Sequence, residues 1–237
     1  MRDNPIREEY SFDKHMTDSL ENAMEIGREG LRNLSGIKMA KKTSIIGIIT
    51  CIVYFISVGL FLATQSAVFL TVWELMTVIS GPVVLLVLLG FGKVLSTSNT
   101  QKKLLLVFMG CTCALTAVAH IVNITVTRRL ISEGVEVPTY FQIGYWPSVE
   151  MAIDYTAWGL FTGLAFLAIS IPLSSSIKVL KRIKIISLVC SFLCIAGFCG
   201  ALFINENLWY LAPLGYGIGL IILCVQVLLY KEVSAES

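Results

Sequence analysis

Six long apolar segments constrain the fold of this chain more than any other feature. Each has about 20 residues or more, and a helix of that length crosses a hydrocarbon layer of about 30 Å. Only 14% of the residues are charged, against about 25% in soluble domains. The sequence therefore predicts an all-α fold, a polytopic transmembrane bundle of six helices. The predicted spans are residues 43–64, 67–92, 104–126, 150–173, 185–204 and 208–230.

The distribution of basic residues predicts the orientation of these spans. If the chain crosses at every segment, 16 of the 18 Lys and Arg residues share one side, and Arg128 and Arg129 lie on the other. Cytoplasmic loops carry such an excess, so both termini are expected in the cytoplasm. The basic residues of 174–184 are expected to contact anionic lipid head groups. Nothing in this pattern indicates binding to nucleic acid.

Residues 1–42 are predicted to form a cytoplasmic segment with one amphipathic helix over 17–35. Thr17 or Asp18 would cap this helix, and Gly36 would end it. Its apolar residues recur at helical spacing, which predicts docking onto the cytoplasmic face of the bundle or onto a protein partner. Residues 231–237 are predicted to form a short cytoplasmic tail.

Three ionisable residues are predicted to lie at the same depth, on three different spans. Glu74 lies seven residues from the outer end of its span, about 10 Å deep. His120 lies six residues from the outer end of the next span, and Asp154 lies four residues into the fourth. Because charged groups inside a membrane are costly, such residues generally pair or have a function.

Each of these residues belongs to a polar stripe along one helical face, at intervals of three or four residues. Three such stripes at one depth predict a water-accessible pocket that opens outward. The candidate ligand-binding residues are Glu74, Thr77, His120, Asn123, Asp154, Tyr155 and Trp158. Tyr145 and Trp146, in the long connection 127–149, are typical of the interfacial aromatic belt. A lid over the pocket is the alternative role for this connection.

Three functions remain open at this stage. The favoured hypothesis is binding or transport of a small polar or cationic solute, or of a lipid head group. Two carboxylates beside aromatic side chains suit a cation. One alternative is a membrane-embedded enzyme that acts on a lipid with Glu74 or Asp154 as base and His120 as acid or metal ligand. The other is a purely structural set of polar contacts.

No motif supports the enzyme, and the sequence favours a role without catalysis. Neither H-E-x-x-H nor G-x-S-x-G occurs, so no catalytic residue, metal site or cofactor is predicted. All seven cysteines lie inside apolar segments, where cysteine typically packs as a small hydrophobe. Two glycine pairs at GxxxG spacing, Gly159 with Gly163 and Gly215 with Gly219, predict close helix packing.

A weak resemblance covers the second half of the chain. It rests on Trp146, Pro147, Ser148, Glu150, Asp154, Ala157, Trp158, Gly159, Leu160, Phe161, Gly163 and Leu164, followed by Gly215 and Tyr216. In these positions the chain resembles six-span membrane proteins of bacteria that have no assigned function. The resemblance implies six helices and a bacterial cytoplasmic membrane, and it implies no catalytic role.

Overall fold

The computed structural model describes residues 5–95, 97–171 and 178–230, with side chains described for 35–95, 97–171 and 180–230. Six helical stretches are long and apolar enough to cross a membrane, as the sequence predicts. They are Ser35–Thr64, Ala67–Val94, Asn99–Ser132, Val149–Ser170, Leu180–Phe203 and Glu206–Leu228. The protein is thus an all-helical, multi-pass membrane protein.

The first three spans contain α1 (Pro5–Thr64), α2 (Ala67–Val94) and α3 (Asn99–Val122). A π-helical turn, η1 (Asn123–Thr127), continues α3 into the short α4 (Arg128–Ser132). Ser66 caps α2, and Ser98 forms a capping box with Gln101 at the start of α3. These caps satisfy backbone N–H groups and therefore fix where the two spans begin.

The last three spans are less regular. A 3-10 turn, η2 (Thr139–Phe141), lies in the connection to the fourth span, which comprises α5 (Val149–Tyr155), the π turn η3 (Thr156–Phe161) and α6 (Thr162–Ser170). The fifth is α7 (Lys178–Phe203). The sixth comprises the 3-10 turn η4 (Glu206–Tyr210), α8 (Leu211–Pro213), the π turn η5 (Leu214–Gly219) and α9 (Leu220–Leu228).

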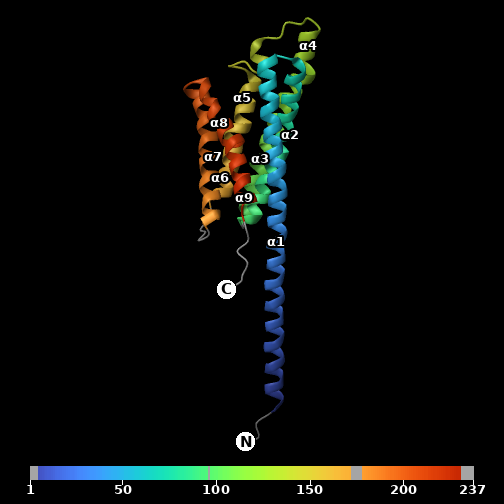
Figure 1. Ribbon diagram of the computed structural model, residues 1–237, viewed down its shortest axis with the longest axis vertical. Helices are drawn as coiled ribbons and strands as arrows, with labels where there is room; N and C mark the ends of the chain where they lie inside the picture. The colour runs from blue at the N-terminus through green and yellow to red at the C-terminus, as the bar shows by residue number, and fades with distance from the viewer. Residues whose placement is uncertain (1–4, 96, 172–177, 231–237) are drawn as a thin grey trace.

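The six spans pack as a closed ring in chain order. Each span contacts the next, and α9 packs back against α1, while α2 also touches α6. We call the end that carries the connection 133–148 the connection end, and the opposite end, where α9 finishes, the termini end (Figure 1).

The interior of the ring divides into an apolar half and a polar half. The termini end is filled by large apolar side chains, among them Phe91, Met109, Phe166 and Leu223, all fully buried. The buried carboxylate and imidazole side chains of the described part are Glu74, His120 and Glu150, and these lie in the connection half. The interior of the bundle is therefore apolar at the termini end and contains ionisable side chains in the connection half.

The predicted end of the amino-terminal helix is wrong. The structure has one helix, α1, that runs from Pro5 to Thr64 without a break at Gly36. Its first half extends away from the bundle and does not fold back onto it (Figure 1). A glycine inside a helix costs about 1 kcal/mol relative to alanine, which a helix already anchored in the membrane tolerates. Gly36 instead allows close approach, because a Cβ there would lie 3.3 Å from the Cβ of Lys93. Docking onto a protein partner stays a prediction.

Candidate functional site

Glu74 lies at the centre of the polar half and is fully buried. One carboxylate oxygen forms an ion pair with the guanidinium of Arg128, and the other accepts a hydrogen bond from the side-chain amide of Asn123. Arg128 also donates to the hydroxyl of Thr71 at 2.7 Å. Glu74 is therefore a partnered acid, held from α2, η1 and α4 together.

His120 lies between two carboxylates on different helices. Its Nδ1 is 3.9 Å from Oε1 of Glu74, and its Nε2 is 3.5 Å from Oδ1 of Asp154. The imidazole is 1% exposed, and neither nitrogen has a hydrogen-bond partner among the described groups. The structure thus brings together the three ionisable residues that share a depth in the sequence. Their role in binding a ligand stays a prediction.

Arg128 is the residue of this cluster that sequence reasoning missed. The third span was predicted to end at residue 126, which put Arg128 in the exterior loop, whereas the helix continues to Ser132. Side chains of a helix lean toward its amino terminus, so a long side chain at this position points back into the bundle. A signal was present, because a buried carboxylate needs a cation and few basic residues lie at this end.

Three π turns contribute residues to the same half of the bundle. They contain Asn123, Trp158 and Tyr216, one in each of the third, fourth and sixth spans. The carbonyl of Ala157 in η3 accepts hydrogen bonds from the hydroxyls of Thr112 and Thr162. Because π turns are rare and frequently mark functional sites, three of them at one end single out this region.

A pocket of about 480 Å³ lies at the connection end. Arg128 and Asn123, the two partners of Glu74, form part of its wall, together with Trp73 of α2. The segment from Gln142 to Tyr145 covers another side, so the long connection does line the pocket. The remaining lining residues are Phe61, Leu62, Gln65, Leu70, Thr127 and Ile131.

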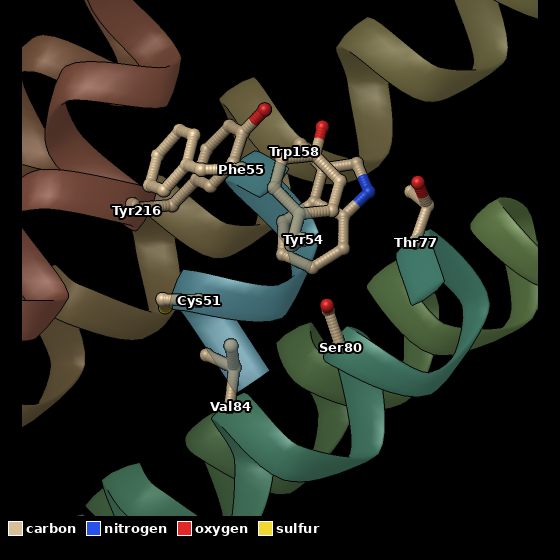
Figure 2. A pocket seen from close by; sticks show the side chains of 9 residues that line it. Cys51, Tyr54, Phe55, Thr77, Ser80, Val84, Trp158 and Tyr216 are labelled. Carbon is tan, nitrogen blue, oxygen red and sulfur yellow. The ribbon is translucent and has the colours of Figure 1, made fainter. Parts of the chain in front are cut away.

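A second, smaller cavity lies deeper, between α1, α2, η3 and η5, and Figure 2 shows the side chains around it. Its volume is about 20 Å³, roughly the room that one water molecule needs. Thr77, Ser80, Trp158 and Tyr216 line it, and the indole N–H of Trp158 has no partner in the described part. Tyr54 also lines it, and its hydroxyl accepts from the indole N–H of Trp73 at 3.3 Å. Trp73, in the wall of the large pocket, thus contacts a residue that lines the small cavity.

The predicted site residues are therefore distributed over three places. Asn123 lines the large pocket, whereas Thr77 and Trp158 line the small cavity. Glu74, His120 and Asp154 form the ionisable cluster behind the pocket wall. Tyr155 lies in an aromatic stack, with its ring 5.0 Å from that of Trp146 and 4.0 Å from that of Trp209.

Comparison with known proteins adds no assignment: no protein family, no curated protein and no solved structure matches this chain. Among the described residues, no three His, Cys, Asp or Glu side chains are arranged to hold a metal ion. Any functional conclusion therefore rests on the geometry of the pocket and the cluster.

Proposed function

We propose that this multi-pass membrane protein binds a small polar solute or a lipid head group in the pocket at the connection end. The observation that carries the proposal is the pocket wall itself. Arg128 and Asn123 present polar groups to about 480 Å³ of space, and both also hold the buried Glu74. A ligand that contacts either residue would therefore act on the ionisable cluster.

The composition of the lining supports a ligand with both polar and apolar parts. Asn123, Arg128 and Gln142 supply hydrogen-bonding groups, while Trp73 and Tyr145 supply aromatic surface. Binding sites for small molecules typically combine a mostly apolar wall with a few placed polar groups. A head group or a small organic solute meets both requirements.

Orientation is the first testable part of this proposal. We infer that both termini lie in the cytoplasm, because of the unequal distribution of Lys and Arg. The resemblance in the second half of the chain implies that the membrane is a bacterial cytoplasmic membrane. Reporter fusions after Leu95, Glu133 and Asn205 are expected to lie inside, outside and outside. A fusion that reports the opposite side would mean that the pocket faces the cytoplasm.

Ligand binding is expected to depend on free space in the pocket. Purified protein would be screened by thermal shift against tetramethylammonium, methanesulfonate, glycerol, phosphocholine and glycerol phosphate. A compound that raises the Tm should lose its effect in Ile131→Trp, because the indole fills the pocket from α4. The control is Ile121→Trp, since Ile121 is partly exposed on α3 and is not a lining residue. Equal shifts in both variants would place binding elsewhere.

A further inference from the structure

The pocket wall carries the positive charge of Arg128, whereas the ion-pair partner of Arg128, Glu74, is not part of the wall. Arg128 is the charged residue among those that line the pocket. Its side chain is 22% exposed, whereas Glu74 is 0% exposed. The two carboxylates that would suit a cation, Glu74 and Asp154, are absent from the lining. A ligand in the pocket therefore contacts the side chain of Arg128 before it contacts either acid.

An anion in this position competes with Glu74 for Arg128. Guanidinium groups bind carboxylate, sulfonate or phosphate oxygens through paired N–H donors. The Nε of Arg128 is buried and has no hydrogen-bond partner in the described part, so the side chain must turn before this N–H can reach an anion. When the guanidinium turns to an anion, Glu74 keeps only the amide of Asn123. A carboxylate left without its cation in a buried site strongly favours its protonated form.

A titratable side chain lies between Glu74 and the partly open side of the cluster. His120 lies between Glu74 and Asp154, with one ring nitrogen toward each carboxylate. Asp154 is 14% exposed, so the cluster has a partly open end. The other titratable groups near Asp154 are Glu150, one turn earlier in α5 and also buried, and Tyr54, Tyr155 and Tyr216. Phenols ordinarily titrate near pH 10, so the three tyrosines keep their protons at neutral pH.

We propose that the pocket takes up a small anion together with one proton, with Arg128 binding the anion and Glu74, reached through His120, holding the proton. This inference rests on the proposed function and names its ligand class. The charges balance, because the anion adds one negative charge and the proton, taken from water, adds one positive charge. Glu74 is then neutral, and Arg128 is paired with the anion.

Calorimetry with methanesulfonate tests the proposal, since this monoanion does not titrate in the range used. Binding of methanesulfonate to the full chain in nanodiscs is expected to weaken as the pH rises. The affinity should fall about tenfold for each pH unit over which binding takes up one proton. Titrations in two buffers of different ionisation enthalpy should count one proton per bound anion. Arg128→Gln should abolish binding.

Glu74→Gln provides the decisive comparison. Without the carboxylate, anion binding should no longer take up a proton at Glu74. At pH 8 it should be tighter than in the unmodified protein, because Arg128 no longer has a charged partner. The matched control is Glu133→Gln, which removes an exposed carboxylate that pairs with Arg129. That variant should keep the pH dependence. If Glu74→Gln does not fold, the proton count on the unmodified protein decides alone.

The possible failures are distinguishable. Anion binding that needs Arg128 but takes up no proton would overturn the coupling and leave the proposed function in place. Binding of tetramethylammonium or glycerol that Ile131→Trp blocks, with no binding of methanesulfonate, would overturn the anion class alone. If no compound of the panel binds, the proposed function fails, and this inference fails with it.

Discussion

Replacing Arg128 by methionine is expected to destabilise the folded protein by about 3 kcal/mol. The variant removes the cation that pairs with Glu74, while Glu74 stays fully buried between α2 and α3. A buried charge without its partner costs far more than the intact pair contributes, because the lost attraction no longer offsets the cost of removing the carboxylate from water. Reversible unfolding in mixed micelles would measure the loss.

Two further variants separate this effect from a general change of charge. Combining Arg128→Met with Glu74→Gln should recover most of the stability, since the amide that remains carries no charge. Arg129→Met serves as the control, because Arg129 is exposed and its pair with Glu133 lies at the surface. Exposed pairs contribute 1 kcal/mol or less. Equal losses in Arg128→Met and Arg129→Met would contradict the buried pair.

The spans could be predicted from the sequence because membrane thickness sets a length that hydropathy reveals directly. The juxtaposition of Glu74, His120 and Asp154 could also be anticipated, since residues on neighbouring spans at one depth tend to meet. Arg128, the partner of Glu74, was missed because the prediction ended the third span at residue 126. The π turn η1 adds a residue to this span, which rotates every later position by about 100° from regular helical spacing.

The position of the pocket depends on information that a single sequence does not contain. The pocket lies between the first three spans and the connection, so it requires the lateral order of the helices. The stripes predicted which face of each helix is polar, but not which of those faces meet around empty space. At Gly36 the sequence was misleading. Glycine commonly ends helices, but this glycine instead allows close packing against Lys93.

Glycine also determines how the fifth span packs, and here the sequence was informative. Both predicted glycine pairs face α7. A Cβ on Gly159 would lie 3.2 Å from the carbonyl oxygen of Cys194, and one on Gly163 would lie 3.3 Å from that of Ser191. A Cβ on Gly215 would lie 2.7 Å from the carbonyl oxygen of Cys190. The fourth and sixth spans thus approach the backbone of α7 from two sides.

Gly215→Val is expected to destabilise the bundle by about 3 kcal/mol, at the upper end of what overpacking costs. The atoms that a side chain would meet include a backbone oxygen, which cannot move aside without shifting α7, as well as the sulfur of Cys194 at 2.8 Å. The displaced helices would also disturb the contact between Trp158 and Tyr216, whose rings lie 4.8 Å apart beside the small cavity.

The same substitution at Gly110 of α3 is the control, because a Cβ there meets no atom within 4 Å. Gly110→Val should unfold at nearly the same denaturant concentration as the unmodified protein, whereas Gly215→Val should unfold well below it. Gly215→Ala is expected to fall between them, since it adds the clashing Cβ without the two further methyl groups. If Gly215→Val were as stable as Gly110→Val, α7 would not be packed against the sixth span. The closed ring, and with it the enclosure of the ionisable cluster, would then be wrong.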